Sequence, residues 1–300
     1  AVYLNVRPSL PFYIPLFIPG ASYIGSLVAV IRLKQIPEST RKFFDIGIAG
    51  PLAGFVVSLF LLVWGFTHLP DKEAYLLPIN PDYTTIFGHV PSEAEMMTYI
   101  EREAFKVDSI AQVLDQPVEV RAYYHVGTSL IFEWLKDWLA DPEQVPNHFD
   151  LIHYPFLFVG YITLFFTALN LLPMGQLDGG HIIYGMFGPN VGGIVARVSL
   201  LVLILMGGTG LVSLETGDWL YMTFQILYIP FLFVLCRKIL NKQDLLAQVM
   251  LTMSILIIQA GIKWAYPELE MNFIWLLYSA MVSFLVGLDH PEAYLEHRVN

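Results

Sequence analysis

Long apolar runs separated by short polar stretches dominate the chain. A membrane-spanning helix needs about 20 consecutive, mostly apolar residues. Six runs approach that length: 43–67, 155–172, 191–212, 219–236, 245–263 and 273–288. The pattern therefore predicts an all-α polytopic membrane protein with about six transmembrane helices.

The first 35 residues do not follow this pattern. Their four prolines remove backbone donors too often for a spanning helix, and a stretch rich in small and β-branched residues follows them. We expect residues 10–34 to be extended and to form a short membrane-associated β-hairpin. An irregular loop is the alternative.

A long polar stretch separates the first two apolar runs. Ser92 and Glu95 have the spacing of a capping box, which predicts a helix that runs to about Leu114. Apolar residues between Leu130 and Leu139 recur at helical spacing and predict a second, amphipathic helix. Its apolar face could lie on the bilayer surface or cover the protein.

Composition and charge support this division. The chain is 56% hydrophobic and 14% charged, whereas soluble domains are about 25% charged. The net charge of −10 falls within residues 68–150, which hold 15 acidic and 5 basic residues. We therefore expect 68–150 to be an acidic extramembrane insertion, and 1–67 with 151–300 to form one membrane-embedded core. A nucleic-acid partner is not expected, because such binding depends on Lys and Arg.

Basic residues indicate the orientation of the core. They precede the first run, begin the third and separate the fourth from the fifth, so they share one side if the runs alternate. The positive-inside rule makes that side cytoplasmic. The end of the second run then faces the cytoplasm, and the acidic insertion lies on the opposite side.

Residues 167–181, T-A-L-N-L-L-P-M-G-Q-L-D-G-G-H, hold the candidate chemistry. Asn170 and Pro173 should end a helix, since proline donates no backbone hydrogen bond. Irregular backbone at membrane depth is tolerated where it lines a cavity or is buried in protein, and a carboxylate there suggests function. Asp178, and His181 beside it, are plausible zinc ligands. The alternative is a re-entrant turn in which Asp178 caps a helix.

Three glycines mark the first apolar run. Gly47, Gly50 and Gly54 fall on one helical face, and small residues so spaced let another helix approach closely. They predict helix packing rather than chemistry.

The Asp178 segment closely resembles the second metal motif of the site-2 protease family, the intramembrane zinc metalloproteases of the M50 type. That motif reads N-x-x-P-x-x-x-L-D-G-G. It is matched by Asn170, Pro173, Leu177, Asp178, Gly179 and Gly180. Leu171 stands where the commoner form has proline, as in a bacterial and plastid branch. Four further stretches resemble that branch: S-L-P-F-Y-I-P at 9–15, F-D-I-G-I-A-G-P-L-A-G-F at 44–55, G-T-S-L-I-F-E at 127–133 and G-L-D-H-P at 287–291.

The resemblance implies a zinc metalloprotease that cleaves transmembrane segments of membrane proteins within the bilayer. It makes Asp178 a Zn²⁺ ligand beside two histidines of an H-E-x-x-H motif, whose glutamate is the general base. The 300 residues contain no H-E-x-x-H. We expect this motif upstream of Ala1, and we expect residues 1–300 alone to be inactive.

The resemblance also suggests roles for neighbouring residues. Asn170 either holds the extended backbone of a substrate or caps the broken helix, and Pro173 shapes the cavity. His181 is expected to support the site or the fold rather than bind the metal. The glycine face should pack against the helix that carries H-E-x-x-H. We expect a bacterial cytoplasmic membrane, with Asp178 toward the cytoplasm.

Two other functions fit parts of the pattern. A catalytically inactive membrane scaffold would explain the absence of H-E-x-x-H from these residues. A transporter would also have broken helices and a polar site inside the membrane, but no internal repeat is visible in the sequence.

Overall fold

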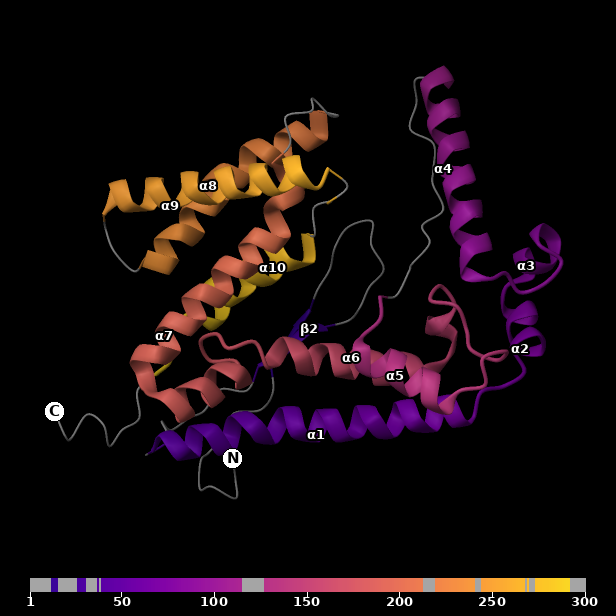
Figure 1. The fold of residues 1–300 in the computed structure, drawn as a ribbon, viewed down its shortest axis with the longest axis horizontal. Coiled ribbons are helices and arrows are strands. Elements are labelled where there is room, and N and C mark those ends of the chain that lie inside the picture. Colours follow the sequence, from indigo (N-terminus) through magenta and orange to yellow (C-terminus); the bar gives the residue numbers. More distant parts are fainter. Residues whose placement is uncertain are drawn as a thin grey trace. The chain divides into compact units, whose positions relative to one another are not determined.

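The computed structural model describes residues 12–15, 26–30, 37, 39–114, 127–212, 219–240, 244–267, 269 and 273–291. The chain divides into two compact units. Unit 1 comprises Ala1–Leu52 with Ala168–Asn300, and unit 2 comprises Ala53–Thr167. Figure 1 shows the elements of both units, coloured along the chain.

The described residues are predominantly helical. Unit 1 contains or shares β1 (Phe12–Pro15), β2 (Ser26–Val30), α1 (Thr40–Thr67), α6 (Pro155–Asn170), α7 (Asp178–Gly208), α8 (Trp219–Leu240), α9 (Leu245–Ala265), α10 (Phe273–Met281) and a π-helical turn (Val282–Val286). Unit 2 holds the rest of α1 and α6, with α2 (Lys72–Ile79), α3 (Pro81–Ile86), α4 (Glu93–Leu114) and α5 (Leu130–Leu139).

Four helices in the described part of the chain are long and apolar enough to cross a membrane. They are Thr40–Thr67, Asp178–Leu211, Met222–Leu240 and Leu245–Ala265. The other two predicted spans are shorter helices, Pro155–Asn170 and Ile274–Val286. A 16-residue helix such as α6 is about 24 Å long, less than the roughly 30 Å hydrocarbon core. The predicted number of six spans is therefore not confirmed.

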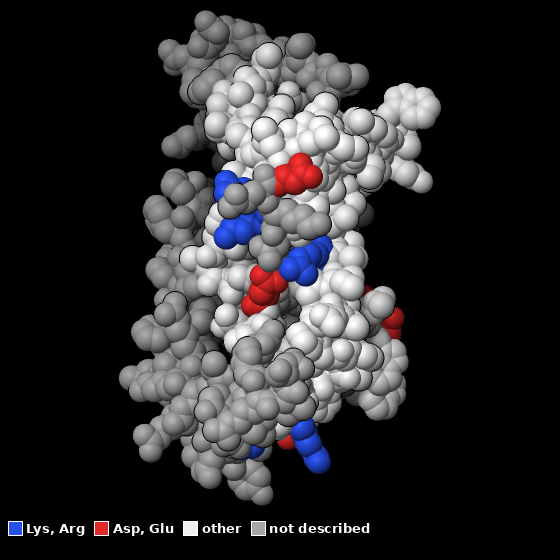
Figure 2. Space-filling model, turned by 90° about the vertical axis from the view of Figure 1, so that its left-hand side faces the viewer, with Lys and Arg blue, Asp and Glu red and all other residues white. Residues whose placement is uncertain are grey.

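The surface agrees with a membrane protein. Figure 2 shows one face on which charged side chains are few and gather near the middle, while most described residues around them are uncharged. Many large apolar side chains are exposed along the candidate spans, among them Phe60 of α1 and Ile226 of α8. Such exposure suits contact with lipid rather than water.

The third predicted span starts earlier than the sequence suggested. The apolar run predicts a span at 191–212, whereas α7 begins at Asp178 and continues through a kink at Gly188. Gly188 has φ 77° and precedes Pro189, so the left-handed backbone and the missing proline donor together bend the helix.

The two N-terminal strands pair antiparallel, with Phe12 opposite Val30 and an irregularity between Ile14 and Pro15. Residues 16–25, which connect them, lie outside the described residues. Contact of this pair with a membrane remains a prediction.

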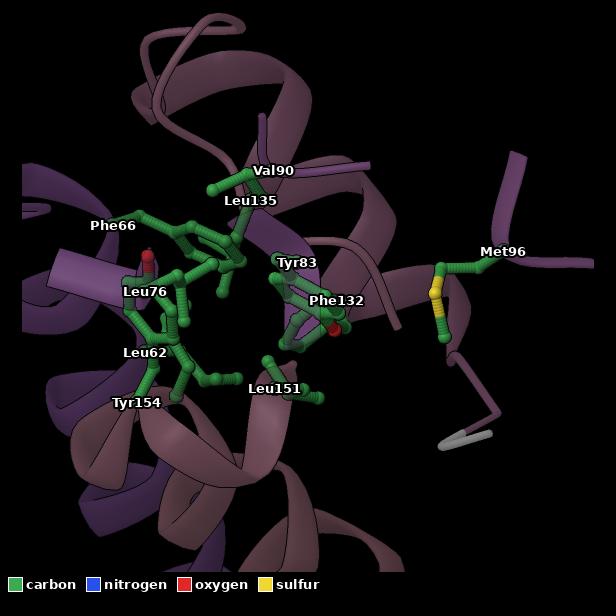
Figure 3. Close-up of a cluster of buried hydrophobic side chains, with 11 residues drawn as sticks. Leu62, Phe66, Leu76, Tyr83, Val90, Met96, Phe132, Leu135, Leu151 and Tyr154 are labelled. Carbon is green, nitrogen blue, oxygen red and sulfur yellow. The ribbon is translucent and has the colours of Figure 1, made fainter. Parts of the chain in front are cut away.

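Unit 2 has its own hydrophobic core, drawn in Figure 3. Phe66 near the end of α1 packs with Leu76 of α2, Tyr83 of α3 and Phe132 of α5, and each is at most 7% exposed. Leu157 of α6 belongs to the same cluster. Helices of the acidic insertion thus share a core with the end of α1 and the start of α6.

The capping box predicted for α4 is confirmed. The Ser92 backbone N–H donates to Glu95 Oε2 at 2.8 Å, and the Glu95 N–H donates to Ser92 Oγ at 3.3 Å. Hydrogen bonding from Ser92 holds the pKa of Glu95 below its ordinary value. The helix runs to Leu114, as the sequence predicted.

Asp150 is a buried carboxyl group in unit 2. Tyr83 Oη donates to Asp150 Oδ1 at 2.7 Å, and the Asp150 N–H donates to Asn147 Oδ1 at 2.9 Å. Asp150 Oδ2 has no hydrogen-bond partner among the described residues. Burial raises the pKa of Asp150, because the ionised form loses hydration that the Tyr83 hydrogen bond only partly replaces.

Candidate functional site

The site is built around the break between α6 and α7. The last residue of α6 is Asn170, as predicted. Pro173 has no N–H and therefore cannot donate to the Leu169 carbonyl one turn earlier. That carbonyl instead accepts from the Leu172 N–H at 3.2 Å and from Tyr278 Oη at 2.8 Å. The carbonyl at the break therefore has hydrogen-bond donors from the protein, as a backbone group away from water requires.

Glycines let the connecting loop fold against the start of α7. Gly175 has φ 51°, and a Cβ there would lie 1.8 Å from the Gly287 carbonyl oxygen. A Cβ on Gly179 would lie 2.1 Å from the Leu171 carbonyl oxygen, and one on Gly180 would lie 2.2 Å from that of Gly175. Gly179 and Gly180 are helical, so they are needed for space rather than for a backbone that only glycine adopts.

Asp178 is the first residue of α7. The N-cap residue is Leu177, and the helix start has no side-chain capping bond. The Asp178 carboxylate is half-buried, and among the described residues it has no hydrogen-bond or ion-pair partner. The structure therefore does not show the alternative in which Asp178 caps a helix. An unpartnered, largely desolvated carboxylate is unusual, and it is available to a ligand.

The glycine face of α1 lies directly against this carboxylate. A Cβ on Gly47 would lie 2.7 Å from the Asp178 carbonyl oxygen and 2.8 Å from His181 Cβ, and one on Gly50 would lie 3.2 Å from Asp178 Oδ2. From the other side, a Cβ on Gly185 would lie 2.7 Å from Phe44 Cβ. Small residues on both helices thus permit the close approach of α1 and α7.

Gly54 belongs to unit 2, where an added Cβ would lie 2.7 Å from Thr167 Oγ1 of α6. Packing of the three glycines against a helix that carries H-E-x-x-H remains a prediction, because the 300 residues do not contain that motif.

Asn170 is half-buried at the end of α6. Its side-chain amide makes no hydrogen bond to another residue in the described part of the chain, so it does not cap the broken helix there. Its role toward a substrate backbone remains a prediction, as does the role of Pro173 in shaping a cavity.

His181 follows Asp178 by one helical turn and is 9% exposed. Its Nδ1 lies 2.5 Å from Nε2 of His290, and its ring stacks on Phe43 with centroids 5.5 Å apart. His290 had no predicted role. The only signal was the similarity of the G-L-D-H-P stretch at 287–291 to the family.

The described residues do not form a complete zinc site. A catalytic zinc is usually held by three protein ligands, and no group of three or more His, Cys, Asp or Glu side chains in the described part of the chain could hold a metal. Asp178 supplies one suitable carboxylate whose oxygens are not engaged elsewhere. The residues present therefore fit one ligand position and not the whole site.

The fold and site define a helical protein of membrane type with an available carboxylate at a helix break. The chain belongs to Peptidase family M50, which matches residues 12–207.

Curated relatives agree with this family. The chain is 26% identical over 220 residues to "Probable zinc metalloprotease EGY2, chloroplastic" of Oryza sativa subsp. indica, covering 73% of this chain and 31% of the relative. It is 40% identical over 201 residues to "Probable zinc metallopeptidase EGY3, chloroplastic" of Arabidopsis thaliana, covering 65% and 29%. The chain thus spans about a third of the length of these relatives. No solved structure matches it.

These names support zinc at the level of the family. They also describe chloroplastic plant proteins, so the comparisons give no support to the predicted bacterial cytoplasmic membrane.

Proposed function

We propose that this chain carries the Asp178 part of an intramembrane zinc metalloprotease of the site-2 protease type, which cleaves transmembrane segments of membrane proteins. The observation that carries this proposal is the state of Asp178. Its carboxylate lies at a satisfied helix break, against a glycine face and without a described protein partner. It also stands at the aspartate of the family pattern.

In this proposal Asp178 holds one ligand position of Zn²⁺, and two histidines and a general-base glutamate come from an H-E-x-x-H motif upstream of Ala1. Bound zinc would polarise the scissile carbonyl and make water a stronger nucleophile. Residues of this chain orient the reactants. The close approach of Gly47 and Gly50 keeps the Asp178 turn against α1, and Asn170 offers an unengaged amide to an extended substrate backbone.

The substrate must lose its own helical hydrogen bonds before a peptide bond can be cut. A backbone unwound in lipid needs new partners. The amide of Asn170, eight residues before Asp178, would provide one donor and one acceptor for it. Pro173 fixes φ after the break and so restricts the conformation of this part of the loop.

The insertion contributes a second membrane contact in this proposal. Trp134 and Trp138 of α5 are 62% and 68% exposed, and their rings stack with centroids 5.4 Å apart. Leu130 continues the same exposed stripe, while Phe132 and Leu135 on the other face are buried. We propose that the exposed stripe lies at the lipid–water interface, where tryptophan is favoured.

A cleavage assay tests the central part of the proposal. In the full-length protein, Asp178→Asn should abolish cleavage of a reporter transmembrane substrate while membrane insertion stays normal. Asp244→Asn is the matched control, because Asp244 caps α9 through the Leu246 and Ala247 N–H groups and asparagine caps equally well. Retained cleavage in Asp178→Asn would refute the assignment. Reading the coding sequence upstream of Ala1 for H-E-x-x-H separates the protease from an inactive scaffold.

A further inference from the structure

We propose that residues 287–291 form a positioning segment for Asp178, and that His290 is the residue through which this segment acts. The inference rests on the proposed function of Asp178. The segment contacts the chain on both sides of Asp178, once before it and once after it. All the residues involved belong to unit 1.

The first contact lies before Asp178. Gly287 has φ 84°, and its carbonyl oxygen occupies the place where a side chain at Gly175 would begin, 1.8 Å from that notional Cβ. The Gly287 N–H donates to the Val282 carbonyl at 2.8 Å, which ties the segment to the end of the π-helical turn. Gly287 therefore sets the position of the loop that leads into α7.

The second contact lies after Asp178. His290 Nδ1 lies 2.7 Å from the Pro291 carbonyl oxygen. The other ring nitrogen, Nε2, lies 2.5 Å from Nδ1 of His181, a residue 109 positions away in the sequence. A carbonyl only accepts, so Nδ1 of His290 must carry the proton. In the neutral ring Nε2 is then the acceptor, and His181 Nδ1–H donates to it.

Ring packing fixes His290 in this orientation. Its ring stacks on Tyr184 with centroids 4.1 Å apart and meets Phe43 edge-on at 4.6 Å. Both Tyr184 and Phe43 are fully buried. The adjacent Asp289 accepts from Arg197 Nη2 at 2.9 Å, which attaches the segment to α7 a second time.

These contacts have one consequence for Asp178. The loop before it is held at Gly175 and the turn after it is held at His181, so the first residue of α7 cannot shift alone. Among the described residues, its carboxylate has no hydrogen bond or ion pair that would fix it. The segment therefore supplies the orientation that a ligand-binding carboxylate ordinarily gets from hydrogen-bonded neighbours.

Two substitutions separate the hydrogen bond from the packing. His290→Gln keeps an acceptor near the position of Nε2 but removes the ring. His290→Phe keeps a ring for Tyr184 and Phe43 but removes the acceptor. His68→Phe is the matched control, because His68 also stacks on an aromatic ring, that of Trp64 at 4.0 Å, but lies in unit 2.

In full-length protein, we expect His290→Phe to lower kcat for reporter cleavage by about 10- to 100-fold with KM unchanged, the range found when groups that orient metal ligands are removed. His290→Gln should restore most of this loss, and His68→Phe should match wild type. Combining His181→Phe with His290→Phe should cost no more than either change alone, because both remove the same bond.

A readout without activity uses zinc-free protein. Amide hydrogen exchange over residues 174–182 should be faster in His290→Phe than in wild type and near wild type in His290→Gln, while exchange in α9 stays unchanged. Gly287→Ala perturbs the other end of the segment independently, since φ 84° disfavours alanine although nothing lies within 4 Å of the added Cβ. It should accelerate the same amides and lower kcat.

Asp178→Asn in the same assay distinguishes failure of the proposed function from failure of the positioning role. If it retains cleavage, the proposed function fails. If it is inactive while His290→Phe and Gly287→Ala both cleave like wild type, the positioning role is overturned and the proposed function stands. A larger loss in His290→Gln than in His290→Phe would also overturn it, because ring packing rather than the hydrogen bond would then explain the effect.

Discussion

A Cβ placed on Gly50 would lie 3.2 Å from Asp178 Oδ2. This contact joins α1, near the start of the chain, to the first residue of α7. Because Gly50 has no side chain, α1 leaves room for the carboxylate that we propose binds zinc. The position of that carboxylate therefore depends on both α1 and α7.

The glycine face should therefore respond differently at two positions. A methyl group at Gly47 would lie 2.7 Å from the backbone of Asp178, which cannot move without α7, whereas one at Gly50 meets a carboxylate that can rotate. We expect Gly47→Ala to lower the melting temperature in detergent and to abolish cleavage, and Gly50→Ala to impair cleavage with a smaller change in stability.

Gly261→Ala is the matched control, because apart from its own helical turns no atom of the described residues lies within 4 Å of the added Cβ on α9. It should leave both stability and cleavage intact. Wild-type behaviour of Gly47→Ala would show that α1 and α7 do not approach as described.

The hydroxyl of Tyr278 should stabilise the helix break. It donates to the Leu169 carbonyl that Pro173 leaves without its helical donor, and Tyr278 is 2% exposed. Tyr278→Phe should destabilise the protein by about 0.5–1.5 kcal/mol, the usual net contribution of one hydrogen bond, because the Leu172 N–H still donates to that carbonyl. Thermal or denaturant unfolding in detergent measures this, with exposed Tyr266→Phe as the control. An equal, negligible effect of both changes would argue against the bond.

Some of this arrangement follows from local sequence and some does not. Ser92 and Glu95 predict the start of α4, and Asn170 and Pro173 predict the end of α6, because capping and the missing proline donor act within one turn. The kink at Gly188 was missed because α7 continues helically on both sides of it.

Contacts between distant residues could not be predicted from the sequence. The pairing of His181 with His290 joins residues 109 positions apart, and no periodic pattern encodes it. Nor does the sequence show that carbonyl oxygens of the preceding loop occupy the space that side chains at Gly179 and Gly180 would need.

Unit 2 should lose stability as pH rises. Burial raises the pKa of Asp150 above 3.8 despite the Tyr83 hydrogen bond and the nearby charges of His153 and Lys72. The folded state therefore holds the proton more tightly than the unfolded chain. The resulting stabilisation is complete below pH 3.8 and is lost as pH rises through the raised pKa.

Comparing the melting temperatures of wild type and Asp150→Asn at a series of pH values isolates the contribution of Asp150, because the two proteins share every other titratable group. The wild-type melting temperature should fall relative to that of Asp150→Asn as pH rises from about 4 to 7. Asp137→Asn, at an exposed carboxylate, should show no such trend. A wild-type advantage that grows with pH would contradict the sign.

The stacked tryptophans of α5 should report the membrane interface. The fluorescence of these two tryptophans is the difference between wild type and the double variant Trp134→Phe with Trp138→Phe. In lipid vesicles, lipids brominated near the headgroup should quench it more than lipids brominated near the chain end, as expected for an interfacial belt. Strong quenching by iodide in water with no effect of brominated lipid would place α5 away from the bilayer.

Zinc content of the purified protein tests the central claim most directly. The described residues offer no group of three His, Cys, Asp or Glu side chains that could hold a metal, so residues 1–300 alone should bind zinc weakly. Full-length wild type and Asp244→Asn should retain zinc after dialysis, and Asp178→Asn should lose most of it. Asp178→Asn that keeps as much zinc as wild type would contradict the account.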